Sequence, residues 1–224
     1  MKHIKDDDPI KREIAAEALS NFANKKSKDA LKMLLRDEQE FVRAMAAESL
    51  GILKDKSAVD DLIVLLDDRV EFVRIESIDS LGAIKSIKAE DALIHSLLKD
   101  KSAIARGYAA ESLAEIGSVK AYKIIRKKLL TEKQGHAKLR MYGALYMMGD
   151  NKSITRIYEY LKSRYYRIRC AAVNTLIFIL EEDDVNETAE ILAEFYEKEK
   201  TIAVRSSIES FFKEYDIDGL RNPD

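Results

Sequence analysis

The sequence predicts an all-α fold: a right-handed α-solenoid (an α-α superhelix) of about seven helical pairs, with an incomplete first repeat. Three observations predict it. A ten-residue phrase recurs along the chain, its apolar positions follow the period of a helix, and turn chemistry is scarce, with 8 Gly and 2 Pro in 224 residues. A repeat of about 31 residues that nearly fills the chain is typical of a solenoid rather than of a compact domain.

The repeated phrase contains one arginine in each copy. It is clearest in FVRAMAAESL, FVRIESIDSL and IARGYAAESL, and becomes fainter toward the C-terminus. The seven copies are centred on Arg12, Arg43, Arg74, Arg106, Arg140, Arg169 and Arg205. Successive arginines are 31, 31, 32, 34, 29 and 36 residues apart, which sets the repeat length.

Each arginine is expected to lie on a helix. The positions one before it and three, four and seven after it are apolar or small in most copies, as in Val42, Ala46, Ala47 and Leu50. This stripe has a period of 3.6, with alanines where two helices approach closely. A second helix, such as KDALKMLL or AVDDLIVLL, and a short acidic turn precede most copies. The first copy has no such helix in front of it, so the first repeat is predicted to be incomplete.

The repeat predicts one elongated domain over residues 9–214, between a charged tail at residues 1–8 and a C-terminal tail at residues 215–224. Pro9 stands where the first turn of a helix tolerates proline. Glycines are expected at or just beyond the ends of the arginine helices, where they commonly act as caps. These are Gly51, Gly82, Gly117 and Gly149.

An aspartate precedes each of the first four arginines by six residues. Such an acid can accept hydrogen bonds from the guanidinium of the arginine that follows it by one and a half helical turns. These bonds would connect the turn to its own helix and, by extension, to the next repeat. In the later copies the position holds Gln134, Ser163 and Glu199. Because these residues recur in every clear repeat, we expect a structural ladder rather than catalysis. Its members are Asp6, Arg12, Asp37, Arg43, Asp68, Arg74, Asp100 and Arg106.

A turn aspartate followed by VRxxAAxxLG, and then by a helix of the AVxxLxxLL kind, resembles HEAT repeats. The resemblance is to the short HEAT-like type named after phycobilin lyase subunits; it covers roughly residues 6–212 and is strongest in the first four copies. It implies that the arginine helix lines a concave face and the other helix a convex face. Proteins of this kind are mostly adaptors, with a few enzymes and enzyme subunits.

By that resemblance, the exposed inner positions lie one, two, five and nine residues after each arginine. They are acidic in the N-terminal half and apolar in the middle of the chain. Aromatic and methionine anchors in a charged frame are common in protein interfaces, and acidic side chains attract a basic partner. The alternative is a solvated helix face. The predicted protein-binding residues are Glu13, Glu17, Met45, Glu48, Glu76, Asp79, Tyr108, Glu111, Glu115, Met141, Tyr142 and Leu145.

The charge is segregated along the chain. Residues 118–169 contain fourteen Lys or Arg and three acids, whereas residues 170–224 contain five bases and fourteen acids. Arginines and tyrosines alternate in the basic block, a mixture that can pair with phosphates and stack on bases. Alternatively, the basic block neutralises its neighbours and its tyrosines fill a core. The residues predicted for nucleic-acid binding are Lys120, Lys123, Lys127, Arg164, Tyr165 and Arg167.

No catalytic, cofactor or metal site is predicted. The histidines His3, His95 and His136 have no ligand spacing, and Cys170 is expected to be a packing residue. The polar N-terminus, the single cysteine and the absence of a long apolar run predict a cytoplasmic protein without a membrane span. The leading hypothesis is therefore a non-enzymatic adaptor that binds a basic protein surface. A nucleic-acid binder is the alternative, and a lyase or modifying-enzyme subunit is a third.

Overall fold

The computed structural model describes residues 2–180 and 185–217. Within these ranges the chain forms thirteen α-helices and three short 3-10 helices, without a strand, which confirms the all-α prediction. The chain divides into two compact units, residues 1–131 (unit 1) and residues 132–224 (unit 2). The single domain expected over residues 9–214 stays a prediction. None of the described helices is both long enough and apolar enough to cross a bilayer.

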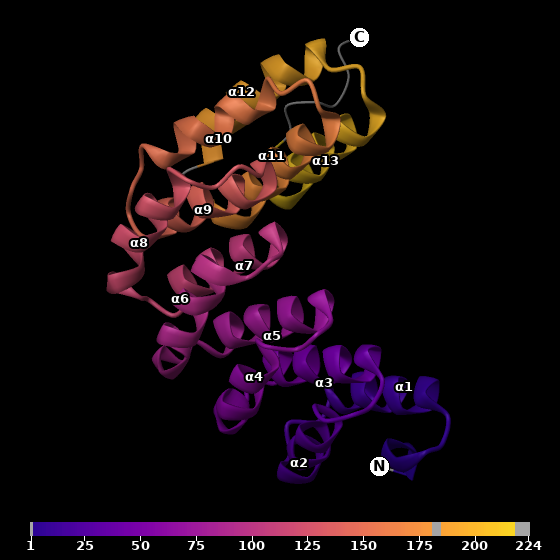
Figure 1. The fold of residues 1–224 in the computed structure, drawn as a ribbon. Helices are drawn as coiled ribbons and strands as arrows, with labels where there is room; N and C mark the ends of the chain where they lie inside the picture. The colour runs from indigo at the N-terminus through magenta and orange to yellow at the C-terminus, as the bar shows by residue number, and fades with distance from the viewer. Residues whose placement is uncertain (1, 181–184, 218–224) are drawn as a thin grey trace. The chain divides into compact units, whose positions relative to one another are not determined.

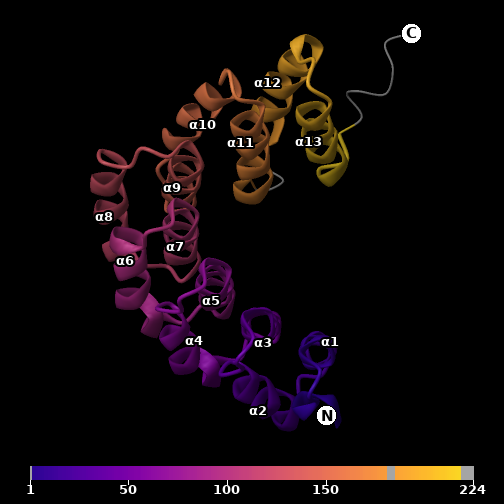
Figure 2. The ribbon, with the colours of Figure 1, turned by 45° about the vertical axis from the view of Figure 1, so that its right-hand side comes forward.

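Unit 1 has two layers of helices (Figures 1 and 2). The arginine-bearing helices pack side by side in chain order, and α2, α4 and α6 each pack against the arginine helix that follows; α8 packs on α6 and α7. The arginine layer consists of α1 (Pro9–Leu19), α3 (Glu40–Ile52), α5 (Glu71–Ile84) and α7 (Ala103–Glu115). The other layer consists of α2 (Lys25–Leu34), α4 (Val59–Leu65), α6 (Glu90–Lys99) and α8 (Val119–Leu129). The 3-10 helices are η1 (Lys2–Lys5), η2 (Lys56–Ala58) and η3 (Ile87–Ala89).

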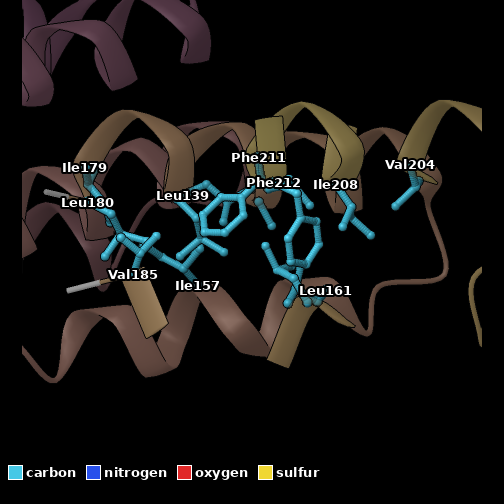
Figure 3. Close-up of a cluster of buried hydrophobic side chains, with 14 residues drawn as sticks. Leu139, Ile157, Leu161, Ile179, Leu180, Val185, Val204, Ile208, Phe211 and Phe212 are labelled. Atoms are coloured by element: carbon cyan, nitrogen blue, oxygen red, sulfur yellow. The ribbon is translucent and has the colours of Figure 1, made fainter. Parts of the chain in front are cut away.

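Unit 2 repeats this pattern. Its arginine helices α9, α11 and α13 pack in chain order, α10 packs on α9 and α11, and α12 packs on α13. The bounds are α9 (Gly135–Met147), α10 (Ser153–Leu161), α11 (Tyr166–Ile179), α12 (Val185–Lys198) and α13 (Ile202–Glu214). Figure 3 shows the buried cluster that these helices share, in which Leu139, Ile157 and Phe211 are fully buried.

In unit 1, the arginines of the first three copies each join two successive turns. In α5, Arg74 donates from Nη1 to the backbone oxygen of Asp68, 3.0 Å away, in the turn before its own helix. Its Nε and Nη2 donate to the two carboxylate oxygens of Asp100, at 2.8 and 2.9 Å, in the turn of the next repeat. Arg12 and Arg43 bind Asp37 and Asp68 in the same two-pronged way. Such bidentate, charge-assisted bonds are strong and geometrically specific.

The acid of each pair also shapes its own turn. Asp68 Oδ1 accepts from the backbone N–H of Val70 at 2.9 Å, and Asp100 Oδ1 accepts from that of Ser102 at 2.7 Å. Although burial acts to raise the pKa of Asp100, the hydrogen bonds from Arg74 and Ser102 hold that pKa below its ordinary value. One carboxylate therefore closes a turn and receives the arginine of the preceding repeat.

The ladder thus differs from the expected pairing of acid and arginine within one copy. Within a copy, the arginine binds only the backbone oxygen of the acid. The carboxylate of that acid accepts instead from the arginine of the preceding copy. Asp6 shows the consequence, because its carboxylate binds His3, Lys11 and the N–H of Asp8 rather than Arg12. In unit 2, Arg169 and Glu199 form the same bidentate contact at 2.7 and 3.0 Å.

Serine hydroxyls align the arginine helices of unit 1. Ser49 Oγ donates to the carbonyl of Ala16 at 3.0 Å, Ser80 Oγ to that of Ala47 at 2.8 Å, and Ser112 Oγ to that of Ile78 at 2.9 Å. All three serines lie six residues after their arginine, and all three carbonyls lie four residues after the preceding one. The same register is therefore repeated at each helix–helix contact.

Two glycines expected beyond the helix ends lie inside the helices. Gly51 belongs to α3 and Gly82 to α5, whereas Gly117 and Gly149 adopt φ values of 74° and 90° after α7 and α9. A Cβ at Gly51 would lie 2.9 Å from Ser80 Cα. Gly51 therefore permits the close approach of α3 and α5, a packing role rather than a capping one.

Breaking one ladder pair should destabilise unit 1 strongly. The side chains of Arg74 and Asp100 are 5% and 4% exposed, so Asp100→Asn leaves a buried guanidinium without its counter-charge. We expect a loss of about 3 kcal/mol in the free energy of unfolding. Urea unfolding followed by circular dichroism measures it. The control is Asp60→Asn, which breaks the exposed pair with Lys88 and should cost under ~1 kcal/mol; equal losses in the two variants would contradict the ladder's role.

Gly51→Ala should also destabilise the chain, by about 1–3 kcal/mol, because the added methyl group meets the backbone of Ser80. Glycine-to-alanine changes inside a helix usually stabilise it. The matched control is Gly135→Ala, where the nearest atom at 3.0 Å is the flexible end of Ile168. Thermal unfolding should give a lower Tm for Gly51→Ala than for Gly135→Ala. An increase in Tm for Gly51→Ala would contradict the prediction, because it would show that α3 and α5 can accommodate the methyl group.

Candidate functional site

The regular register of unit 1 collects equivalent side chains on one surface. We call it the arginine-helix face: the exposed or partly buried side chains two, five and nine residues after the arginine in α1, α3, α5 and α7. The aligned helices of this layer are seen in Figure 2. Together with Glu13, which follows Arg12 directly, the face comprises Ile14, Glu17, Asn21, Met45, Glu48, Ile52, Glu76, Asp79, Ala83, Tyr108 and Glu115.

Acidic side chains from three helices gather on this face. Glu48 lies on α3, Glu76 and Asp79 on α5, and Glu115 in the last turn of α7. Burial, and then the charges of Glu48 and Asp79, raise the pKa of Glu76. Burial and the charge of Asp79 raise the pKa of Glu115 to about 6, although Lys85 opposes this rise. The carboxylates are therefore close enough to repel one another.

Gly82 makes room for the most perturbed of these acids. A Cβ on Gly82 would lie 2.1 Å from Glu115 Oε2, so the carboxylate rests directly over the backbone of α5. This contact explains the partial burial of Glu115 and the desolvation that raises its pKa. The sequence pattern placed Glu115 on this face, but it contained no sign of the contact with Gly82.

Apolar side chains interrupt the acids. Ile14 is 57% exposed and Ile52 is 60% exposed, while Met45 and Tyr108 are partly buried. The two isoleucines were not among the residues predicted to bind a partner, although they occupy inner positions of the repeat. Because exposed aliphatic side chains can anchor a partner, they belong to the candidate site.

Three predicted binding residues are buried, contrary to the exposure expected for them. Met141 is 0% exposed, Leu145 is 2% and Glu111 is 5%. The position directly after the arginine is buried in α3 and α7 as well, at Ala44 and Gly107. In unit 2, Tyr142 is partly buried, and its ring centroid lies 6.4 Å from that of Tyr160. Unit 2 therefore does not present the apolar anchors expected there.

The basic block does not form one uniform surface. Lys120 in unit 1 is ion-paired with Asp91, as expected if this block neutralises its neighbours, while Lys123 and Lys127 are exposed. In unit 2, the hydroxyl oxygen of Tyr158 lies 2.7 Å from Thr188 Oγ1, and Tyr160 packs beside the core cluster.

A second group of basic and aromatic residues in unit 2 is open to solvent. Tyr165 and Tyr166 are 57% and 43% exposed. The guanidinium carbon of Arg164 lies 4.5 Å from the centroid of the Tyr165 ring, and that of Arg167 lies 5.9 Å from the centroid of Tyr166. This turn combines cations with available aromatic faces.

In the described part of the chain, no three His, Cys, Asp or Glu side chains gather in a way that could hold a metal ion. Cys170 is partly buried and packs against the core cluster of unit 2, which agrees with a packing role.

Comparison with known proteins confirms the resemblance inferred from the phrase. Residues 1–82 match the family model described as HEAT repeats. The structure of the complex of CpcE and CpcF of phycocyanin lyase from Nostoc sp. PCC7120 is similar, with a TM-score of 0.71 and 21% identity, over 96% of this chain and 91% of that chain. At this identity the similarity shows the fold alone.

Two further solved structures resemble the chain more weakly. Human deoxyhypusine hydroxylase in complex with glycerol has a TM-score of 0.40 at 16% identity, over 95% of this chain and 82% of that chain. A designed armadillo repeat protein has a TM-score of 0.40 at 16% identity, over 96% of this chain and 97% of that chain. No curated protein matches the sequence.

The acids of the arginine-helix face should make stability depend on pH. The pKa of Glu115 rises from 4.5 to about 6 on folding, so between these values the folded chain binds the proton more tightly than the unfolded chain. Glu115 therefore lowers the free energy of unfolding as the pH rises through this window. Glu115→Gln should remove that slope and stabilise the chain by about 1 kcal/mol at pH 7, because solvent screens the charge of a partly exposed side chain.

Urea unfolding at pH 4.5, 6 and 7 tests this prediction. Glu199 provides a contrast of opposite sign. Although burial acts to raise its pKa, hydrogen bonds from Arg169 and Thr201 lower it to about 2. Glu199 therefore stabilises the chain above pH 4.5, and this contribution is lost as the pH falls toward 2. A Glu115→Gln variant less stable than the parent at pH 7 would contradict the raised pKa.

Proposed function

We propose that the chain, whose residues 1–82 match HEAT repeats, is a non-enzymatic adaptor that binds a protein partner with a basic surface. The arginine-helix face of unit 1 is the binding surface. One observation carries the proposal: Glu48, Glu76, Asp79 and Glu115 gather from three helices, and burial, together with the charges of neighbouring acids, raises the pKa of Glu76 and Glu115. A cationic partner relieves this repulsion and therefore gains free energy at this place.

The apolar residues of the face give the partner more than charge. Ile14 and Ile52 are largely exposed, and Met45 of the same face is partly buried. Burying such side chains stabilises a complex in proportion to the apolar area removed from water. The acids around them steer a basic partner and disfavour an acidic one. The face thus combines anchors with charge selection, which is how protein interfaces are commonly built.

A nucleic-acid binder is the second candidate, and it is favoured by the turn of unit 2 that carries Arg164, Tyr165, Tyr166 and Arg167. Exposed tyrosine rings can stack on unpaired bases while the arginines contact phosphates. Binding of this kind weakens steeply with salt. A lyase or modifying-enzyme subunit is a further alternative, since the CpcE and CpcF complex of phycocyanin lyase has a similar fold.

Reversing two charges on the face should abolish binding of the protein partner. We propose a pull-down of the tagged chain from native lysate, with and without nuclease, followed by titration of the recovered partner. Glu48→Lys with Asp79→Lys should weaken its affinity at least about tenfold, because both changes repel a basic surface.

The matched control makes the same change in charge on α12, with Glu194→Lys and Glu197→Lys, which are exposed and lie outside the face. This variant should bind like the parent. An equal loss of affinity in both variants would show that only the net charge of the chain matters. Unchanged affinity in the first variant would refute the proposed face. Recovery that depends on nucleic acid and is lost in Tyr165→Ala with Arg167→Gln would favour the second candidate.

A further inference from the structure

A pocket of about 390 Å³ opens in unit 1 where two successive turns meet. It is lined by residues of α4 and α6 and by the turns that lead into α5 and α7. Small-molecule sites usually fall in this range of volume. None of its lining residues belongs to the arginine-helix face, so the pocket is a separate feature of the unit.

Basic side chains surround this pocket without partners. Arg69, Lys99 and Lys101 line it, and none of them forms an ion pair or a side-chain hydrogen bond with another residue in the described part of the chain. Arg69 and Lys101 each follow a ladder acid directly, and they are therefore equivalent positions of neighbouring repeats. The ladder places two turn cations beside each other, and the end of α6 adds a third.

The acids near these cations are already engaged. Asp68 accepts from Arg43, and Asp100 accepts from Arg74, both as buried bidentate pairs. Asp67 is the remaining acid of the lining, which also contains the three cations that form no ion pair. The lining therefore carries an excess of positive charge that an anionic ligand would neutralise.

A serine hydroxyl also lines the pocket. Ser96 is 4% exposed, and its side chain has no hydrogen-bond partner in residues 2–180 or 185–217. Because no buried side-chain oxygen of these residues lacks a partner, the Ser96 hydroxyl is open to solvent and free to donate to a ligand. Beside it, Ile63, Leu66 and Ala92 form an apolar wall.

We propose that this pocket binds a small phosphomonoester. Arg69 can offer two parallel N–H donors to the phosphate, while Lys99 and Lys101 act as flexible point charges. Ser96 donates its hydroxyl to a phosphate oxygen. The pocket is larger than a bare phosphate ion needs, and the apolar wall contacts the organic part of the ligand. No bond is made or broken in the ligand.

Isothermal titration calorimetry of the full chain tests the proposal with O-phosphoserine, inorganic phosphate and serine, at low ionic strength because salt screens such charges. O-Phosphoserine should bind, inorganic phosphate should bind more weakly, and serine should not bind. Absence of heat with O-phosphoserine up to about 10 mM would overturn the proposal. Equal affinity for inorganic phosphate would overturn the role of the apolar wall.

Variants locate the site. Arg69→Gln with Lys101→Gln should weaken O-phosphoserine binding at least about tenfold. Lys99→Gln should weaken it less. Ser96→Ala should weaken binding without lowering Tm, because the hydroxyl makes no hydrogen bond in the free chain. The control is Lys123→Gln with Lys127→Gln on α8, which also removes two exposed positive charges. Equal loss in this control would show non-specific attraction and would overturn the assignment.

Discussion

The bond on which unit 1 depends is the bidentate contact between an arginine and the turn carboxylate of the next repeat. Arg12, Arg43 and Arg74 each make it, with a third bond from the same guanidinium back to the turn of their own helix. One side chain therefore fixes three things together: the turn before its helix, the turn after it and the distance between them. Arginine suits this task because its planar fork matches a carboxylate, whereas lysine offers only a point charge.

The candidate binding face follows from this alignment. Because the ladder and the serine hydroxyls repeat the same register, the inner positions of α3, α5 and α7 lie side by side. Glu115 therefore lies near Asp79, and burial together with the charge of Asp79 raises the pKa of Glu115 to about 6. The ladder stabilises the unit, whereas the acids of the face repel one another. Because a cationic partner removes this repulsion, it lowers the free energy of the complex most at this face.

The periodic phrase was sufficient to predict the arginine helices, but not the direction of their bonds. Asp37 lies six residues before Arg43 and 25 residues after Arg12, so one sequence fits both pairings. Likewise, a helical stripe shows which side is buried but not how wide that side is. Met141 and Leu145 fall just inside it and are therefore unavailable to a partner.

Other features depend on contacts that a single helix cannot reveal. Gly51 and Gly82 look like caps in the sequence, but α3 and α5 extend past them, and the glycines serve close packing against the next helix. Glu115 resembles the other acids of the inner positions until its contact with Gly82 is seen. The pocket lined by Arg69, Lys99 and Lys101 arises because two turns 32 residues apart become neighbours, and it corresponds to no local motif.

The most direct test of this account is a pair of double-mutant cycles that share Arg74. One cycle combines Arg74→Met with Asp100→Asn, the partner in the next repeat, and the other combines it with Asp68→Asn, the acid of the same copy. The free energy of unfolding should show a coupling of about 1–3 kcal/mol in the first cycle and a much smaller one in the second. A larger coupling to Asp68 than to Asp100 would contradict the ladder between repeats, and with it the alignment that creates the face.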